Sequence, residues 1–425
     1  FPARVAGMTA TPCALTVSAS PWETADFSVN AGTVQPNIGF SGPAGSVQWV
    51  WNDGSPVETA LNNVVTPHVY AANGTATLRW RKGTSITHFI DSFCLWTFDV
   101  GLLPSTRTNL NCGNALAALT GNVAGLPRGL TSIVVRGSNT LTGQVSDLPP
   151  ALTLLRLYGL NSLSGDVSGF SVTPSIATID LLGNNTISGD VGAFTGITSL
   201  TSFTVGGNNT LGGLLSGFPG SVTVISISGN NTLTGSIGGV TASPLVTLNV
   251  TGNNTLSGDI GLLPASVATV IVSGNNLLTG DVTGLPPNLA EFNVSGSNTI
   301  SGVIADAPSG GALATFILAG NNTLGGDIGS IPASVTRWSL TGTGETATLT
   351  LGTFTPNAGL VRFVDARNLT EAMVDEILIK IEALGTSPAG ALVDVGGINA
   401  PPSATGEAAA VTLEGPGRNW SVTRN

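Results

Sequence analysis

Residues 245–260 read LVTLNVTGNNTLSGDI, and close copies of this phrase begin at residues 130, 152, 176, 200, 222, 267, 289 and 313. One column of the phrase holds Asn in nine successive copies, at steps of 22 to 24 residues. Self-similarity at this period predicts a solenoid, in which each repeat forms one coil that stacks on the next. The column consists of Asn139, Asn161, Asn185, Asn209, Asn231, Asn254, Asn276, Asn298 and Asn322.

The apolar positions of the phrase predict one strand in each coil. Leu248 and Val250 lie two residues apart, as do Phe203 and Val205 in an earlier copy, so each pair shares one face of a strand. A single strand cannot bury that face alone. Stacking the coils about 4.8 Å apart joins the strands into a parallel sheet and creates one long core. Leu256 and its equivalents should fill that core from the opposite wall.

The pattern L-x-x-L-x-V-x-G-x-N-x-L-x-G-x-I resembles the plant-type leucine-rich repeat, with one extra residue between the strand and the Asn. Degraded copies at 99–114 and 335–344 extend the resemblance over residues 99–344. It implies a mainly β fold, a leucine-rich-repeat solenoid with a parallel sheet. We expect an N-terminal extension over 1–14, a β-sandwich over 15–90, a solenoid of about 10–11 coils of 22–24 residues over 91–345, and an α/β cap over 346–425.

The repeated Asn-Asn pair permits two interpretations. A turning chain leaves buried N–H and C=O groups that need partners, and an Asn amide offers both a donor and an acceptor. The second Asn persists where the glycosylation sequence is destroyed, as in Ser-Asn-Thr, so we interpret its column as a structural ladder. The first Asn remains open to N-glycosylation. Those sites are Asn184, Asn208, Asn230, Asn253 and Asn321.

The two ends of the chain differ from the repeat. Residues 46–80, SVQWVWNDGSPVETALNNVVTPHVYAANGTATLRW, alternate aromatic and β-branched residues with turn signals, which favours strands. This segment resembles the polycystic-kidney-disease (PKD) type of immunoglobulin-like domain, and the resemblance implies a structural role for His68 and Tyr70. Near the C-terminus, residues 371–384 have the spacing of an amphipathic helix, with Thr370 and Gly385 as its caps. A strand from Ala391, a helix from Ser403 and a final strand should complete a cap over the apolar end of the solenoid.

Composition excludes several classes of protein. Charged residues make up 9% of the chain and the net charge is −10, so nothing predicts nucleic-acid binding. No apolar run is long enough to span a bilayer, and we expect no membrane insertion. The chain has three cysteines, Cys13, Cys94 and Cys112, and two histidines. Such a set favours buried thiols over a disulfide framework or a zinc site.

The sequence predicts neither a catalytic centre nor a cofactor. Both histidines lie near the N-terminus, and no nucleophile motif is present. Paired carboxylates can hydrolyse glycosides or bind a weak cation such as Ca²⁺. However, the column that carries the acidic residues also holds Gln, Leu, Ser and Val, which indicates a tolerant surface position. We therefore predict a protein that is not an enzyme and holds no metal. The acidic members of the column are Asp166, Asp190, Asp259, Asp281 and Asp327.

One part of the predicted surface differs from the rest. The outward strand positions are mostly Ser, Thr, Asn and aliphatic residues. Arg136, Arg156, Tyr158 and Asp180 instead fall on the outward face of three adjacent coils. Such a cluster can hold a carboxylate or a sugar, and it can also be a plain surface ion pair.

The order of segments, a PKD-like domain, then the repeats, then a helix-strand cap, resembles repeat proteins of tailed bacteriophages and bacterial surfaces. That resemblance implies a multicopy appendage at a virion or cell surface, with residues 1–14 or the first domain as the attachment end. We expect adhesion or receptor recognition, in which the solenoid binds a protein or glycan on a host or neighbouring surface. The alternative is a structural subunit of an extracellular or virion assembly, whose flat solenoid face packs on other subunits.

Overall fold

The computed structural model describes residues 22–425 except 30–31, 35, 42–46, 54, 61–67, 71–73, 82–84, 92–95, 104, 106, 113–117, 241–243, 311–312, 344–348 and 366. Cys13, Cys94 and the expected attachment segment 1–14 lie outside this part of the chain. The chain divides into two compact units. Unit 1 comprises 1–165 and 172–185, and unit 2 comprises 166–171 and 186–425.

Unit 1 combines antiparallel strands with the first coils of the solenoid. Its antiparallel pairs are β1 with β7 and β9, β4 with β5 and β7, β3 with β8, and β2 with β6. The described strands are β1 (Trp22–Val29), β2 (Gly32–Val34), β3 (Pro36–Ser41), β4 (Val47–Val50), β5 (Glu58–Thr59), β6 (His68–Tyr70), β7 (Gly74–Arg81), β8 (Ser85–Asp91), β9 (Trp96–Asp99), β10 (Asn109–Cys112), β11 (Ala118–Thr120), β12 (Ser132–Asn139), β13 (Thr142–Gln144), β14 (Leu154–Gly159), β15 (Ser162–Asp166) and the start of β16 (Thr178–Asp190).

The coils of unit 1 continue directly into the N-terminal strands. β10 pairs in parallel with both β12 and β8, and β11 pairs in parallel with β9. The N-terminal strands thus cover the first coil, which would otherwise expose an apolar cross-section. The likeness of this segment to a PKD-type domain remains a prediction.

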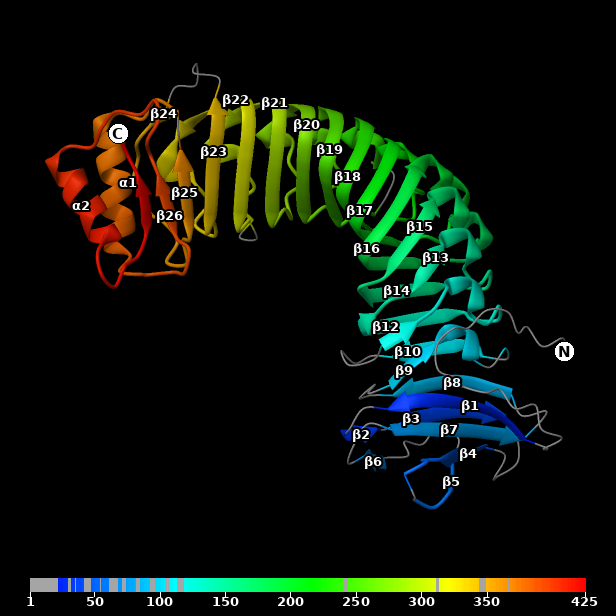
Figure 1. Ribbon diagram of the computed structural model, residues 1–425. Coiled ribbons are helices and arrows are strands. Elements are labelled where there is room, and N and C mark those ends of the chain that lie inside the picture. The colour runs from blue at the N-terminus through cyan, green and yellow to red at the C-terminus, as the bar shows by residue number, and fades with distance from the viewer. Residues whose placement is uncertain are drawn as a thin grey trace. The chain divides into compact units, whose positions relative to one another are not determined.

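Unit 2 contains the longest run of coils and confirms the predicted parallel solenoid. Consecutive strands from β17 to β23 pair in parallel and lie side by side in Figure 1. The strands are β17 (Ser202–Leu214), β18 (Val224–Ser236), β19 (Thr247–Asp259), β20 (Thr269–Asp281), β21 (Glu291–Val303), β22 (Thr315–Asp327), β23 (Arg337–Thr343), β24 (Leu349–Thr350), β25 (Arg362–Asp365), β26 (Leu392–Asp394) and β27 (Ser421–Thr423).

Short 3₁₀ turns form the third side of each coil. They are η1 (Val100–Leu102), η2 (Val123–Gly125), η3 (Val145–Asp147), η4 (Val167–Val172), η5 (Val191–Gly196), η6 (Leu215–Gly217), η7 (Ile237–Val240), η8 (Ile260–Leu262), η9 (Val282–Gly284), η10 (Ile304–Asp306) and η11 (Ile328–Ser330).

The coil of residues 245–260 shows how the phrase folds. Leu248 and Val250 lie on one wall of the coil and Leu256 lies on the next wall, and all three side chains are fully buried in the core. Gly252 forms the corner between them with φ of 139°. A Cβ at this position would lie 2.8 Å from the backbone of the preceding coil, so only glycine fits the corner.

The C-terminal residues extend the sheet and then cover its end. β25, β26 and β27 continue the parallel pairing, and the helices are α1 (Glu371–Ala383) and α2 (Ala404–Glu414). Thr370 caps α1 by accepting from the Met373 N–H at 3.4 Å. The apolar face of α1 is buried, as the helical spacing in the sequence predicts.

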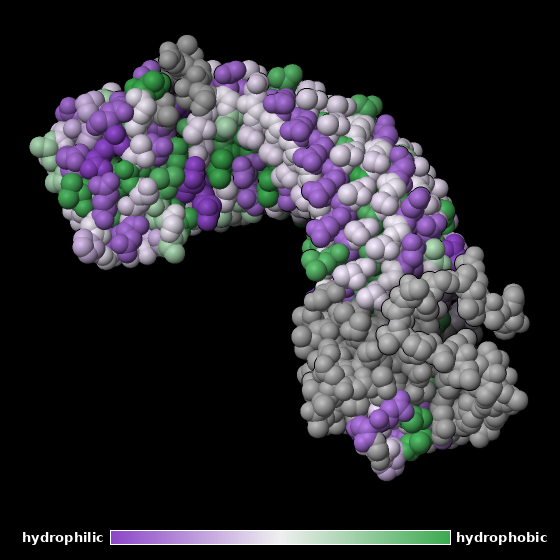
Figure 2. Space-filling view, in the orientation of Figure 1, coloured by the Kyte–Doolittle hydropathy of each residue, from purple (hydrophilic) through white to green (hydrophobic). Residues whose placement is uncertain are grey.

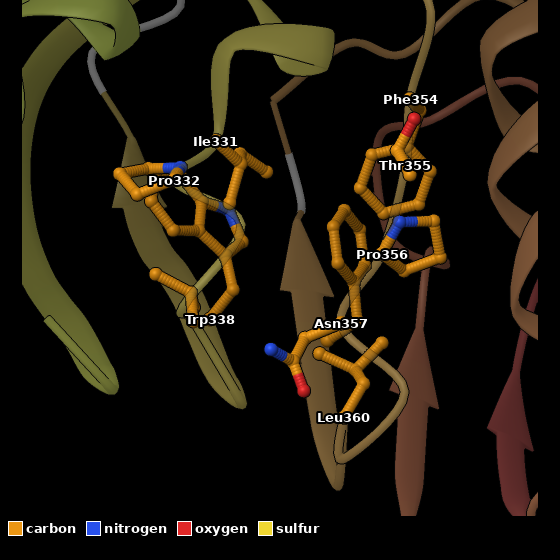
Figure 3. A pocket seen from close by; sticks show the side chains of 10 residues that line it. Ile331, Pro332, Trp338, Phe354, Thr355, Pro356, Asn357 and Leu360 are labelled. Carbon is orange, nitrogen blue, oxygen red and sulfur yellow. The ribbon is translucent and has the colours of Figure 1, made fainter. Parts of the chain in front are cut away.

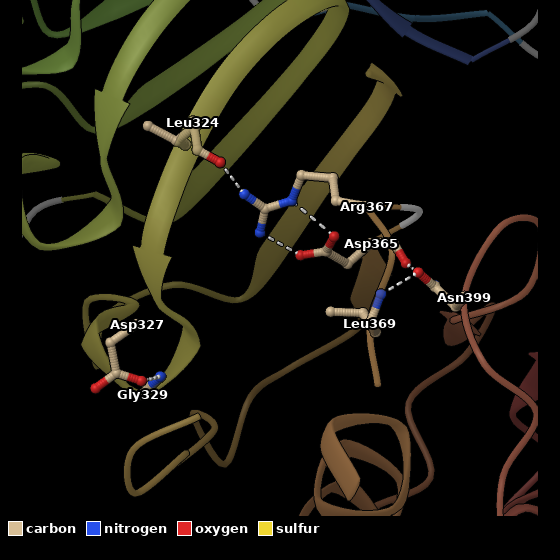
Figure 4. A network of polar contacts seen from close by, with 7 residues as sticks. All are labelled: Leu324, Asp327, Gly329, Asp365, Arg367, Leu369 and Asn399. Carbon is tan, nitrogen blue, oxygen red and sulfur yellow. Dashed lines mark hydrogen bonds and ion pairs between the residues drawn. The ribbon is translucent and has the colours of Figure 1, made fainter. Parts of the chain in front are cut away.

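A buried polar network fixes this cap to the last coils (Figure 4). The Arg367 guanidinium donates to both oxygens of Asp365, at 2.8 and 2.6 Å, and to the carbonyl oxygen of Leu324. Asn399 accepts from the Leu369 N–H at 2.8 Å. Sequence patterns did not reveal this network, because Asp365, Arg367 and Asn399 all lie outside the repeat.

Candidate functional site

Three strands of unit 1 bring the predicted Arg/Tyr/Asp cluster together. In the register of β12, β14 and β16, Val134 lies beside Arg156, and Arg156 lies beside Asp180. Arg136 and Tyr158 each follow by two residues on their strands, so they share the same outward face. We call this face of the parallel sheet, opposite the core, the outward face.

The contacts within the cluster centre on Tyr158. The guanidinium carbon of Arg136 lies 5.1 Å from the centroid of the Tyr158 ring, within cation–π range. The Tyr158 hydroxyl donates to Oδ2 of Asp180. Burial raises the pKa of Tyr158, and the hydrogen bond and negative charge of Asp180 raise it further, against the lowering effect of Arg156 and Arg136. The hydroxyl therefore remains a donor at neutral pH.

Arg156 is the unpaired member of the cluster. Within the described part of the chain its guanidinium makes no hydrogen bond or ion pair, and its Nε is shielded from solvent without a partner. The Oδ1 atom of Asp180 is likewise buried without a donor. The expected alternative, a plain surface ion pair, therefore does not describe the contacts seen here.

An apolar side chain borders the cluster. Leu182 follows Asp180 by two residues on β16 and is 40% exposed. The site thus combines two guanidinium groups, a carboxylate that is already engaged, an aromatic ring and an aliphatic group.

The outward face of unit 2 is different in character. Its strands present mainly Ser, Thr, Asn and aliphatic residues, such as Ser226, Asn249 and Ile271. On the side of unit 2 seen in Figure 2, hydrophilic residues recur between residues of near-neutral hydropathy along the coils, and strongly apolar residues gather toward the C-terminal end. Toward its C-terminal end the outward face of unit 2 also carries the charged residues Glu291, Arg337 and Arg362.

The second Asn of each repeat lies inside the solenoid. Asn254 is fully buried, its Oδ1 accepts from the Leu233 N–H at 2.9 Å, and its Nδ2 donates to the Ser273 carbonyl at 3.2 Å. The amide of one coil thus joins the backbones of the coils on either side. The side chains of Asn139, Asn161, Asn185, Asn209, Asn231, Asn276 and Asn298 are equally buried, and Asn322 is 7% exposed.

The first Asn of each repeat lies outside. Asn184, Asn208, Asn230, Asn253 and Asn321 are exposed, so the geometry is compatible with the glycosylation expected there. That modification remains a prediction.

The repeated Asp column has a structural function. Oδ1 of Asp190 accepts from the Gly192 N–H at 2.7 Å, and that of Asp259 accepts from the Gly261 N–H at 2.8 Å. Each carboxylate caps the 3₁₀ turn that follows it. Hydrogen bonds from Thr283 lower the pKa of Asp281 in the same way. Within the described residues, no group of three His, Cys, Asp or Glu side chains is placed to hold a metal ion.

The pocket in Figure 3 lies between the last coils and the cap. It is lined by Ile331, Pro332, Trp338, Phe354 and Leu360, among others. No charged side chain lines it, and it carries no candidate chemistry. Within the described residues, no helix has the length and hydropathy needed to cross a membrane.

Comparison with solved structures finds several similar proteins. A plant peptide hormone receptor in complex with its hormone is 18% identical, with a TM-score of 0.46, 76% of this chain covered and 60% of the receptor. A plant ice-binding protein is 25% identical, with a TM-score of 0.42, 56% of this chain covered and 79% of that one. A leucine-rich-repeat protein of Leptospira interrogans is 14% identical, with a TM-score of 0.37 and coverage of 76% and 91%.

This chain therefore spans less than two thirds of the plant hormone receptor's length. No protein-family model matches the chain, and no curated protein matches it in sequence.

Proposed function

We propose that this protein is a non-catalytic recognition module, displayed outside the cell, that binds a partner through the outward face of its parallel sheet. The observation that carries the proposal is the cluster of Arg136, Arg156, Tyr158 and Asp180 in unit 1. The comparisons give no support to a virion location, and the proposal does not include one.

The electrostatics of Arg156 support this proposal. A partly buried guanidinium has lost some of its hydration, and within the described residues no acceptor replaces it. Such an uncompensated group is costly, and an acidic group on a partner would offset the cost through charge-assisted hydrogen bonds. A purely structural surface arginine would gain nothing from this arrangement.

Arg337 offers a matched control, because it is also an arginine on the outward side of the sheet but lies on β23 of unit 2. Labelled wild-type protein, Arg156→Ala and Arg337→Ala should be applied to arrays of glycans and peptides. We expect Arg156→Ala to lose binding that Arg337→Ala retains. If copies of the chain instead cross-link through an outward face that is buried in their assembly, the structural alternative holds and the proposal fails.

Ice binding is a second candidate function, and a separate observation favours it. Thr232 and Thr255 hold equivalent exposed positions on adjacent coils, and within the described residues neither hydroxyl makes a hydrogen bond. Thr holds six of the seven positions of this row in unit 2, and Leu277 holds the seventh. Such a row presents uncharged hydroxyl and methyl groups about 4.8 Å apart on adjacent coils. A regular array of this kind suits the surface of ice, in which water molecules also repeat at regular intervals. The row in unit 2 consists of Thr186, Thr210, Thr232, Thr255, Leu277, Thr299 and Thr323.

Ice recrystallisation in the presence of the protein tests this second candidate. Thr232→Tyr and Thr255→Tyr should abolish inhibition, because a bulky ring disrupts the flat array. Ser226→Tyr on the outward face should leave inhibition intact. Recrystallisation that the wild-type protein does not slow would exclude ice binding.

A further inference from the structure

The cluster on β12, β14 and β16 is a positive site on a negative protein. The chain carries a net charge of −10, whereas the cluster has two guanidinium groups and one carboxylate. Asp180 uses one oxygen to accept from Tyr158 and does not pair with Arg156. The site therefore has positive charge available for a ligand.

The same residues disfavour a densely charged anion. Asp180 lies beside Arg156 in the sheet register, so its carboxylate would repel a phosphate or sulfate held by that arginine. Oδ1 of Asp180 is shielded from solvent, so a ligand meets this carboxylate at Oδ2, which accepts from Tyr158 and has a second lone pair for a further donor. A suitable ligand has one carboxylate for the guanidinium groups and a neutral donor, such as a hydroxyl, for Asp180.

The apolar parts of the site favour a ring-shaped ligand. Tyr158 is half-buried and Leu182 is 40% exposed, so both present carbon surface next to the charges. A sugar ring has a face of C–H groups that packs on such surface, while its hydroxyls remain at the edge. A carboxylated sugar unites the three features that the site requires.

We propose that Arg136, Arg156, Tyr158 and Asp180 bind a carboxylated sugar residue within an acidic polysaccharide. This inference rests on the proposed recognition function and names its ligand class. Arg156 holds the sugar carboxylate through the two terminal nitrogens of its guanidinium, because its Nε is shielded from solvent. Arg136 adds charge from its position over Tyr158, and Oδ2 of Asp180 accepts from a sugar hydroxyl. Repeated sugars along the polymer would also allow several copies of the protein to bind at once.

Affinity electrophoresis against polygalacturonate, alginate and hyaluronan tests the inference, with carboxyl-reduced polygalacturonate as the neutral counterpart. We expect retardation by at least one acidic polymer and none by the reduced polymer. Arg156→Gln should weaken binding by about tenfold or more, because it removes a charge-assisted bidentate contact. Arg156→Lys should recover only part of the loss, since lysine has no fork. Arg337→Gln should bind as wild type.

Polyglutamate carries carboxylates but no sugar rings, so it tests whether the site recognises the sugar or only the carboxylate. We expect Asp180→Asn to weaken binding to the acidic polysaccharide, because it weakens the acceptor for the sugar hydroxyl. Any binding to polyglutamate should stay equal or become stronger, because the substitution removes the negative charge beside Arg156. Circular dichroism and thermal melts should show that every variant is folded.

The same experiments distinguish a failure of the sugar assignment from a failure of the proposed recognition function. Two results would overturn the sugar assignment but leave the recognition function in place. In the first, binding depends on Arg156 but is as tight for polyglutamate as for the acidic polysaccharide. In the second, binding depends on Arg156 but is confined to neutral glycans or to proteins on the arrays. If Arg156→Gln binds every ligand as tightly as the wild-type protein does, both the sugar assignment and the proposed recognition function are overturned.

Discussion

The buried Asn column permits a direct test of what holds the coils together, through the substitution Asn254→Ala. The Asn254 amide is fully buried and bonds Leu233 N–H on one side and the Ser273 carbonyl on the other. Alanine leaves both backbone groups buried without a partner. Each unsatisfied group costs about 1–3 kcal/mol, so we expect the two groups together to lower the free energy of unfolding by about 2–6 kcal/mol. The neighbouring Asn253 is exposed, and Asn253→Ala should change stability by about 0.5 kcal/mol or less.

Urea denaturation followed by circular dichroism gives the global values for both variants. Because a solenoid can open locally, hydrogen exchange gives the sharper measurement. In Asn254→Ala the Leu233 amide should lose protection, whereas the Leu256 amide, which donates to Asn276, should keep it. Asn254→Asp should be at least as destabilising as Asn254→Ala at neutral pH, because it would bury an ionised carboxylate against the Ser273 carbonyl oxygen. Equal stabilities for Asn254→Ala and Asn253→Ala would refute the reasoning.

Three further predictions concern the corners, the cap and the turns. Gly252→Ala should destabilise the protein by more than about 1 kcal/mol in urea denaturation, because of its positive φ and the 2.8 Å approach to backbone, whereas Gly196→Ala, with nothing within 4 Å, should be tolerated. Asp365→Asn should cost about 3–5 kcal/mol and expose the cap to proteolysis, because it leaves the buried Arg367 charge without its partner. Asp281→Ala should lower stability at neutral pH. Because folding lowers the pKa of Asp281 from 3.8, the difference from wild type should disappear in thermal melts as the pH falls below that value.

The repeat explains why so much of the fold could be predicted from the sequence. A single strand signal such as that of Leu248 and Val250 is weak, but nine copies in the same phase leave one period consistent with all of them. The copies also separate Asn254 from Asn253, because only the second column persists when the first changes. The four cluster residues could be placed on one face for the same reason.

Features that occur once gave no such signal. The bond from Arg367 to the Leu324 carbonyl joins residues 43 positions apart. Leu324 belongs to the repeat, but Arg367 lies outside it, and the repeat pattern does not show which carbonyl Arg367 contacts. The parallel pairing of β8 with β10 similarly connects two short strands of different segments. The sequence placed Arg156 near Asp180 but could not show that the two fail to pair, because that outcome depends on side-chain geometry, in which Tyr158 takes one Asp180 oxygen.

The solenoid interpretation makes a last prediction about deletions. Removing residues 254–275 joins Asn253 to Asn276 and deletes one full repeat, so every remaining apolar residue keeps its phase. Because each coil contacts only its neighbours, the shortened chain should fold, unfold cooperatively and bind through the unit 1 cluster as wild type does. Removing residues 254–264 instead deletes half a coil, so the strand of the next coil begins where a turn is needed and its apolar residues meet no partner wall. Circular dichroism and thermal melts should therefore show a folded protein for the longer deletion and a misfolded one for the shorter. If the shorter deletion were the better tolerated, stability would not come from the stacking of whole coils.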